Sequence, residues 1–313
     1  MTFSKRGLIF TVDGRAAWSV SHAQIPTADP VSGERIRVYF GTRDRFNRTV
    51  TSYVELSATD PQRILHVHDR PVLGLGELGC FDDSGAMSSW IVGREQGKFL
   101  YYTGWNRAET VSYRLAIGLA ISVDGGVTFE RYSTGPLLDR NTEDPCWVAA
   151  PCVIPVPGGW RMYYIACTHW SVVHGHPEPH YIIKVRESED GLHWRAPGRV
   201  CIHYDDFADA FARPCVYPRE AGGFGMLFSY RSARDYRTDK TRSYRIGLAT
   251  SADGLAWERQ EDPAGLERSP SGWDSEMMAY THLLRHAGTS FLFYNGNGFG
   301  RSGFGYAIAT STR

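Results

Sequence analysis

Apolar, strand-like runs that break at an Asp-Gly pair recur along the chain. The three clearest copies cover residues 113–129, 181–194 and 244–257. An apolar run that stops at Asp-Gly and then resumes with an aromatic residue is typical of two antiparallel strands joined by a tight turn. The pairs begin at Asp124, Asp190 and Asp253, so the steps are 190 − 124 = 66 and 253 − 190 = 63 residues. This spacing indicates a repeat protein.

A second repeated element lies before each hairpin. It is a short aromatic-rich strand, with copies at 37–40, 99–102, 161–164, 225–228 and 291–294. Ahead of each copy lies another apolar strand, at 23–26, 86–92, 148–155, 212–217 and 277–284. The unit is therefore four antiparallel strands, and no sustained helical period interrupts the pattern. Four-stranded units at this period predict the blades of a propeller.

The two ends of the chain are expected to complete one unit together. In the first unit, residues 49–57 and 64–67 supply the third and fourth strands, whereas the fifth unit stops after residues 305–310. Residues 7–12 can supply its missing outer strand, which would close the ring and remove an exposed sheet edge. We predict an all-β fold: a single five-bladed β-propeller domain over residues 1–313, closed by the N-terminal strand.

The composition narrows the range of partners. The 313 residues are 42% hydrophobic, enough for a large core, and 34 Lys and Arg balance 34 Asp and Glu. This balance favours neither nucleic acid nor an anionic membrane surface as a partner. No apolar stretch has the length of a signal peptide or a membrane span, so a cytoplasmic location is expected. The oligomeric state stays open.

The cysteines and histidines give little sign of a metal site. The six cysteines form no Cys-x-x-Cys pair and suit reduced, buried thiols. Residues 169–180 contain four histidines, but their spacing matches no standard zinc pattern, so a metal there is the minority interpretation. We expect no cofactor.

Candidate chemistry gathers on one face of the predicted propeller. The loop from the second to the third strand of a blade lies on the same side as the start of the first strand, so these segments should surround one mouth. Several of them carry acids, and we predict Asp83, Asp144 and Glu276 as catalytic residues in a shared pocket. Acids that face one another would have separated pKa values, as an acid and a base require. A single aspartate before a strand is about equally often a turn former.

The same loops are rich in groups suited to a sugar. Trp105, Trp170 and Tyr230 offer flat apolar faces, although tryptophans more often serve packing. Arginine provides fork-shaped donors for hydroxyl, carboxylate or phosphate groups. The predicted substrate-binding residues are His22, Arg43, Trp105, Arg107, His169, Trp170, Asp209, Arg213, Tyr230, Arg231 and Asp274. The arginine-rich stretch 231–245 also fits a solvated loop.

The hairpins and the five-unit repeat give the chain a family resemblance. Residues 124–129 resemble the Asp-box turn of sialidase-type propellers, where the turn is structural. The whole chain resembles the five-bladed propeller glycosidases of glycoside hydrolase families 43, 32 and 130, and also propeller proteins encoded near bacterial surface-polysaccharide genes. The resemblance implies acids at the starts of inner strands around an axial funnel, at Asp83, Asp144 and Glu276, with Asp209 or Asp274 as substitutes.

The chain departs from that family in its first unit. His22 or Gln24 stands where the hydrolases usually place a catalytic aspartate, which puts the ordinary two-carboxylate mechanism in doubt. The leading hypothesis is a carbohydrate-active enzyme that cleaves or transfers a glycosyl group by carboxylate acid/base catalysis in an axial pocket. One alternative is phosphorolysis, or biosynthetic transfer on a phosphorylated or nucleotide-linked sugar. Another is a non-catalytic sugar-binding propeller.

Overall fold

Five successive groups of strands make up the chain in the computed structural model, which describes residues 1–262 and 264–310. The first group holds β2 (Ser21–Ser32), β3 (Arg35–Arg43), β4 (Thr49–Ser57) and β5 (Ile64–Val67). The second holds β6 (Gly85–Arg94), β7 (Gly97–Arg107), β8 (Tyr113–Ser122) and β9 (Glu130–Arg131). The third holds β10 (Trp147–Val156), β11 (Gly159–Val173), β12 (His176–Ser188) and β13 (Arg199–Ile202).

The last two groups follow the same plan. The fourth holds β14 (Ala210–Pro218), β15 (Phe224–Arg231), β16 (Arg245–Ser251) and β17 (Glu258–Gln260). The fifth holds β18 (Ala279–His286), β19 (Thr289–Asn295) and β20 (Phe304–Thr310) from the end of the chain and β1 (Thr2–Phe10) from its start. Two short helices, η1 (Lys240–Arg242) and α1 (Asn297–Gly300), lie in loops. The prediction of an almost purely β chain is confirmed, and β4 and β5 have the predicted bounds.

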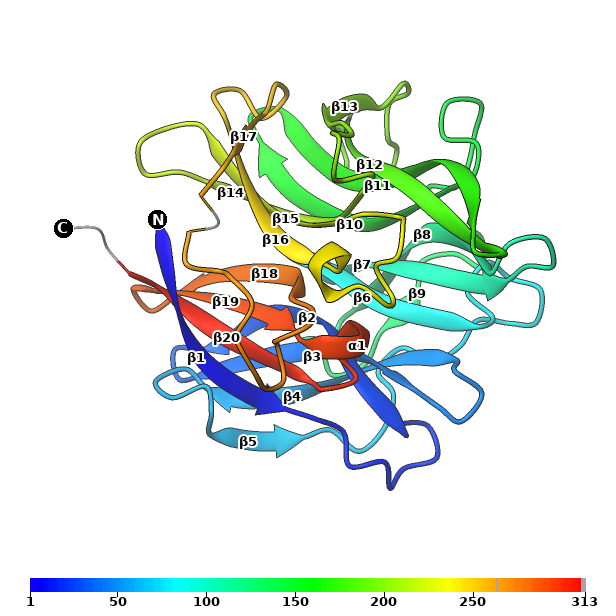
Figure 1. Cartoon of the computed structure of the whole chain (residues 1–313). Helices are drawn as coiled ribbons and strands as arrows, with labels where there is room; N and C mark the ends of the chain where they lie inside the picture. The colour runs from blue at the N-terminus through cyan, green and yellow to red at the C-terminus, as the bar shows by residue number, and fades with distance from the viewer. Residues whose placement is uncertain (263, 311–313) are drawn as a thin grey trace.

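The N-terminal strand completes the fifth group as predicted, but it covers Thr2–Phe10 and not the predicted residues 7–12. β1 runs antiparallel to β20, with Thr2 opposite Thr310 and Phe10 opposite Phe304. Figure 1 shows the two strands, blue and red, side by side. Within every group the neighbouring strands are antiparallel.

The first strands of the groups contact one another in sequence. β2 contacts β6, β6 contacts β10, β10 contacts β14, β14 contacts β18, and β18 contacts β2 again. Single parallel bridges also join neighbouring groups, between Thr49 and Gly85 and between Tyr181 and Ala210. The five first strands are therefore linked in a cyclic order of contacts.

Each Asp-Gly turn is held by its own aspartate. Asp253 Oδ1 accepts hydrogen bonds from the backbone N–H groups of Leu255 at 2.7 Å and Ala256 at 3.0 Å. Gly254 follows with a φ of +75°, a backbone conformation that glycine adopts without a steric cost. The same arrangement recurs around Asp124 and Asp190. The Asp-box interpretation of these turns as structural agrees with these contacts.

Tyrosines tie each of these turns to the preceding group. The Tyr163 hydroxyl of β11 donates to the carbonyl of Gly254 at 2.8 Å, and Tyr101 of β7 donates to that of Gly191 at 2.9 Å. Tyr39 of β3 donates in the same way to Gly126 at 2.7 Å. The repeated turn thus fixes the angle between neighbouring groups as well as joining two strands.

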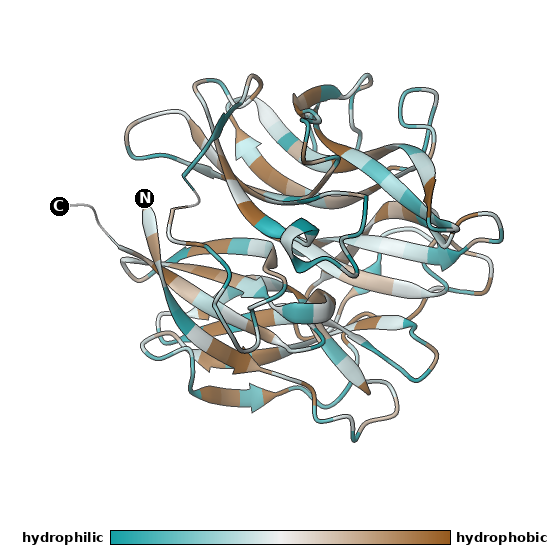
Figure 2. Ribbon diagram, viewed as in Figure 1, coloured by the Kyte–Doolittle hydropathy of each residue, from teal (hydrophilic) through white to brown (hydrophobic). Residues whose placement is uncertain are grey.

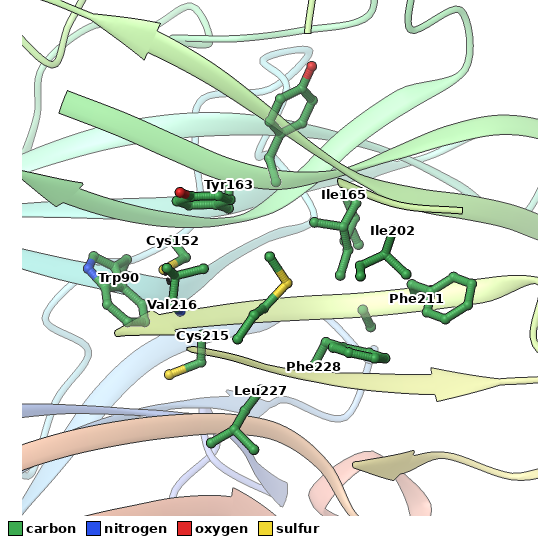
Figure 3. Close-up of a cluster of buried hydrophobic side chains, with 14 of the residues drawn as sticks. Trp90, Cys152, Tyr163, Ile165, Ile202, Phe211, Cys215, Val216, Leu227 and Phe228 are labelled. Carbon is green, nitrogen blue, oxygen red and sulfur yellow. Dashed lines mark hydrogen bonds between the residues drawn. The ribbon is translucent and has the colours of Figure 1, made fainter. Parts of the chain in front are cut away.

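The core fills the space between these groups. Figure 3 shows Cys152 and Cys215 among Tyr163, Val216 and Leu227, and all five side chains are buried. All six cysteines are free, and four of them are buried. Hydrophobic colour in Figure 2 concentrates on the strands, while hydrophilic residues mark the loop that carries η1. No helix in residues 1–262 and 264–310 has the length and apolar character needed to cross a membrane.

Candidate functional site

One cavity of about 320 Å³ is lined by all five first strands. They contribute Gln24 and Ile25 (β2), Met87 (β6), Trp147, Ala149 and Ala150 (β10), Ala212 and Arg213 (β14), and Tyr280 (β18). The connections from second to third strands add Asn47, Tyr236, Arg237 and Phe299. This agrees with the prediction that the two kinds of segment surround one mouth. The volume lies at the small end of the range for small-molecule sites.

Aromatic side chains form much of the wall. They include Trp105, Tyr113, Trp147, Tyr181, Tyr236, Tyr244, Tyr280 and Phe299. The Tyr181 and Tyr244 hydroxyls share a hydrogen bond, and Phe299 of α1 packs against Tyr236 with ring centroids 6.4 Å apart. Burial raises the pKa of Tyr181 and of Tyr280, so both phenols stay protonated and can act as hydrogen-bond donors.

Arg213 places a buried positive charge at the cavity. The residue is only 1% exposed, and its guanidinium donates to Tyr280 O at 3.1 Å, Thr27 Oγ1 at 2.9 Å and Ser89 O at 3.0 Å. These acceptors are all neutral, and its Nε has no hydrogen-bond partner among the described residues. Burial lowers the pKa of Arg213, which shows how costly this charge is without an anion.

Arg231 and Arg43 also donate to neutral acceptors, but Arg43 is only half-buried. Burial lowers the pKa of Arg231, while Tyr181, Tyr244 and Tyr236 raise it, with a net increase. Arg231 is 2% exposed, donates to the carbonyl of Ser232 at 3.0 Å and stacks on the ring of Tyr236 at 3.7 Å. Arg43 donates from Nε and Nη2 to Gln24 Oε1 at 3.2 and 2.9 Å, and burial lowers its pKa. A fourth arginine at the cavity, Arg237, is exposed and paired with Glu178 at 2.9 Å.

The cavity therefore combines positive charge with aromatic faces. None of the described residues that line it is an aspartate or a glutamate. Arg43, Arg213 and Arg231 all line it, and their hydrogen-bond acceptors are an amide, a hydroxyl and backbone carbonyls. A buried cation without a carboxylate is stabilised when an anion binds beside it. The arrangement suits an anionic ligand with an apolar or ring-shaped part.

The predicted catalytic acid Asp144 lies outside this cavity. It is 1% exposed and accepts hydrogen bonds from the Tyr164 hydroxyl at 2.9 Å and from Arg186 Nη2 at 3.2 Å, and it also pairs with Lys184. Its carboxylate is thus fully engaged within its own strand group.

The same motif occurs in two other groups. Asp82 accepts from the Tyr102 hydroxyl at 2.9 Å and pairs with Arg131, and Asp274 accepts from Tyr294 at 3.1 Å and pairs with Lys5. In all three groups the tyrosine follows the aspartate by 20 residues. The equivalent acids are therefore Asp82, Asp144 and Asp274, and each holds a tyrosine and a cation.

Asp83 and Glu276 have other local contacts. Asp83 accepts from the backbone N–H of Gly79 at 3.1 Å and from Ser84 Oγ at 2.9 Å, while Glu276 is 46% exposed and pairs with Lys240. The expectation that Asp83, Asp144 and Glu276 share one pocket is corrected, because none of them lines the cavity. Their role in catalysis stays a prediction, and the contacts favour a structural role for Asp144.

Of the predicted binding residues, Arg43, Trp105, Arg213 and Arg231 meet at the cavity. The residues outside its lining are His22, Arg107, His169, Trp170, Asp209, Tyr230 and Asp274. His22 is buried at the start of β2, and its pKa is lowered to about 4 by that burial and by Arg43 and Arg301. Trp170 packs on Tyr113 at 5.5 Å, so it supports the wall from behind.

Tyr181, Tyr244 and Tyr280 of the cavity wall are not among the predicted binding residues. Tyr181 and Tyr244 begin two of the repeated apolar runs, and Tyr280 lies in the fifth first strand. Because Tyr181 and Tyr244 occupy the same position in two repeats, the repeat pattern could have identified both as candidate site residues. Gln24, which positions Arg43, was noted only as a replacement for an acid.

The chain is similar in sequence to two proteins of Mycobacterium tuberculosis. They are the uncharacterised proteins MT1551 (strain CDC 1551 / Oshkosh) and Rv1502 (strain ATCC 25618 / H37Rv). Each is 38% identical over 309 residues, which cover 98% of this chain and 99% of the relative. No protein-family model matches the chain.

Solved structures of glycosidases share its fold. A thermostable family-43 glycoside hydrolase matches with a TM-score of 0.68 and 17% identity, covering 94% of this chain and 90% of the other. A glycosyl hydrolase from Bacteroides ovatus matches with a TM-score of 0.72 and 14% identity, covering 99% and 94%. A member of family 130, the mannoside phosphorylases that also contain glycoside hydrolases, matches with 0.70 and 14%, again covering 99% and 94%. The chain therefore belongs to the family of the two mycobacterial proteins and has the fold of the propeller glycosidases.

Proposed function

We propose that the five strand groups are the blades of a closed five-bladed propeller and that its axial cavity binds a phosphorylated saccharide. The cyclic contacts of the first strands and the pairing of β1 with β20 support the closed arrangement. The observation that carries the ligand assignment is the meeting of Arg43, Arg213 and Arg231 in an aromatic cavity whose described lining has no carboxylate. Aromatic faces suit the C–H side of a sugar ring, and arginine forks suit a phosphate.

The reaction that best fits this ligand transfers a glycosyl group to or from a phosphorylated partner. Hydrolysis by two facing carboxylates has no support in the cavity lining, which contains no described acid. The arginines would stabilise negative charge on a phosphate, whether it attacks the sugar or leaves it. Protonated Tyr181 or Tyr280 would donate a hydrogen bond to a sugar oxygen. The family-130 phosphorylases on the same fold agree with this choice.

A non-catalytic binding protein is the second candidate. The same absence of acids from the described lining favours it, because the tyrosine hydroxyls, with raised pKa values, are poor bases at neutral pH. Product formation separates the two candidates, while ligand affinity is common to both.

Calorimetric titration with an aldose 1-phosphate, inorganic phosphate and the neutral aldose tests the ligand assignment. We expect the sugar phosphate to bind at least tenfold more tightly than the neutral sugar. Arg43→Gln should weaken that binding by about tenfold to a hundredfold, because a hydrogen bond to a charged group usually contributes this much to affinity. Arg107→Gln is the matched control, since Arg107 is exposed, lies outside the cavity lining and donates to the carbonyl of Phe46. Equal affinity for the neutral sugar, or equal effects of the two variants, would refute the assignment.

A further inference from the structure

A second cluster of reactive groups lies on the β11–β12 hairpin, outside the cavity lining. Ser171 of β11 and His180 of β12 are diagonal neighbours, because His169 pairs with His180 and Ser171 pairs with Glu178. The Ser171 Oγ lies 2.7 Å from His180 Nε2. A serine hydroxyl at this distance from an imidazole nitrogen can pass its proton to the ring as the oxygen attacks a carbon.

The other nitrogen of the same ring faces a carboxylate. His180 Nδ1 lies 3.5 Å from Asp209 Oδ2, and Asp209 Oδ1 accepts a hydrogen bond from the backbone N–H of Ala233. The carboxylate therefore favours the tautomer with the proton on Nδ1, which leaves Nε2 free to accept the proton of Ser171. The order hydroxyl, imidazole, carboxylate is that of a nucleophile, a base and the group that orients the base.

Aromatic contacts fix the ring in this orientation. His169 stacks on His180 with centroids 4.3 Å apart and an interplanar angle of 8°. Tyr204 meets the ring at an edge, with centroids 6.5 Å apart and an angle of 86°. The imidazole is thus held between its two polar partners before any substrate binds, which is the preorganisation a catalytic base requires.

The charges around the ring keep it in the form that accepts a proton. Burial lowers the pKa of His180, Asp209 raises it, and His169, Arg231 and Arg234 lower it further, with a net decrease. The imidazole is therefore neutral at pH 7.

The cluster lies outside the described lining of the saccharide cavity. Successive side chains along a strand point to opposite sides. Tyr181, next to His180, lines the cavity, and Trp170, next to Ser171, packs on Tyr113 of the cavity wall. Ser171, His169 and His180 therefore lie on the side of the hairpin opposite to Trp170 and Tyr181, and Ser171 is partly exposed.

We propose that Ser171, His180 and Asp209 form a second, nucleophilic site that transfers the acyl group of a carboxylic ester to water. Ser171 Oγ would form a bond to the ester carbonyl carbon while its proton moves to His180 Nε2. The C–O bond to the alcohol then breaks, and the alcohol leaves with the proton from His180. A water molecule then attacks the acyl-serine and gives a proton to His180 Nε2. The bond between the acyl carbon and Ser171 Oγ breaks, His180 passes that proton to Ser171 Oγ, and the carboxylic acid is released.

Covalent labelling of the whole chain tests this site. A fluorophosphonate reacts with activated serines, and we expect intact-mass spectrometry to show one adduct, which peptide mapping assigns to Ser171. Ser171→Ala should abolish the adduct, and His180→Gln should slow labelling at least a hundredfold. Asp209→Asn should slow it at least tenfold and shift its pH profile, because the orienting carboxylate is lost. Hydrolysis of p-nitrophenyl acetate should fall in the same order.

The chain contains a matched control pair. Ser21 Oγ lies 2.8 Å from His22 Nδ1, but the charged groups that act on that ring are Arg43 and Arg301 and not an acid. Ser21→Ala should therefore leave labelling unchanged. Thermal unfolding of Ser171→Ala is expected to match that of the unaltered chain, so loss of the adduct would not reflect loss of the fold. No adduct on the unaltered chain, or an adduct that persists in Ser171→Ala, would overturn the proposal.

Discussion

The Tyr164 hydroxyl donates a 2.9 Å hydrogen bond to Asp144 Oδ2, and both residues are buried. Arg186 and Lys184 complete the contacts of this carboxylate. The equivalent pairs Tyr102–Asp82 and Tyr294–Asp274 have the same spacing in the chain. A repeated tyrosine, aspartate and cation therefore anchor the start of three of the five groups.

Replacement of Asp144 by asparagine should destabilise the fold strongly. The change leaves Arg186 and Lys184 buried beside a neutral amide, and loss of one partner from a buried ion pair costs about 3–5 kcal/mol. Urea unfolding followed by tryptophan fluorescence would measure the decrease in the free energy of unfolding.

Asp83→Asn serves as the control for this prediction. Asp83 is partly exposed and its partners are Gly79 and Ser84, so we expect a loss below about 1 kcal/mol. If Asp144→Asn kept its stability and lost only turnover of a saccharide phosphate, the original assignment of Asp144 as a catalytic acid would stand instead.

Local chemistry explains why the strands were predictable from the sequence. The Asp-Gly turns depend on residues within a few positions of one another, as the bonds from Leu255 and Ala256 to Asp253 show. The strands are predictable for the same reason, because the alternation of apolar and polar residues along a strand is also a pattern among near neighbours in the chain. The predicted range 277–284 begins two residues later, at Ala279, because Glu276 and Met277 donate to Asn297 Oδ1 and not to a neighbouring strand.

The chemistry of the site depends on contacts that the sequence does not display. The partners of Asp144 lie on β11 and β12, up to 42 residues away in the chain, so the sequence alone did not indicate its structural role. Arg43, Arg213 and Arg231 were predicted from the sequence as hydrogen-bond donors. Only the structure shows that the described lining of the cavity contains no acid, because residues from five different strands line it. The Ser171–His180–Asp209 contact likewise joins a hairpin to the following group.

Replacement of Tyr163 by phenylalanine should weaken the contact between two neighbouring groups. It removes the 2.8 Å hydrogen bond to the buried carbonyl of Gly254 and leaves that carbonyl without this donor. Trp257 Nε1 still donates to the same carbonyl at 3.1 Å, so a loss of about 0.5–1.5 kcal/mol in the free energy of unfolding is expected, with an unchanged dependence on urea. Tyr132→Phe is the control, because Tyr132 is 51% exposed, and it should change stability by less than about 0.5 kcal/mol. Equal values for the two variants would show that the hydrogen bond from Tyr163 to Gly254 contributes nothing to stability.

The aspartates of the three turns should make the fold sensitive to acid. Hydrogen bonds from the Ala256 and Leu255 backbone lower the pKa of Asp253 to about 2, and the pKa values of Asp124 and Asp190 are also lowered by hydrogen bonds. An unfolded aspartate has a pKa of about 3.9. The stabilisation is therefore complete above about pH 4 and is lost as the pH falls toward 2, where the folded carboxylate also takes up a proton.

Asp253→Asn should reduce the melting temperature at pH 7. It should also flatten the decrease of the melting temperature between pH 4 and pH 2, because one of the three turn aspartates with a lowered pKa is gone. Asp69→Asn provides the comparison, since Asp69 is 80% exposed and pairs only with its exposed neighbour Arg70 at 3.3 Å. Its melting curve should follow that of the unaltered chain throughout this range. A decrease between pH 4 and pH 2 that is equally steep in Asp253→Asn would mean that other carboxylates control acid unfolding and that the turns do not.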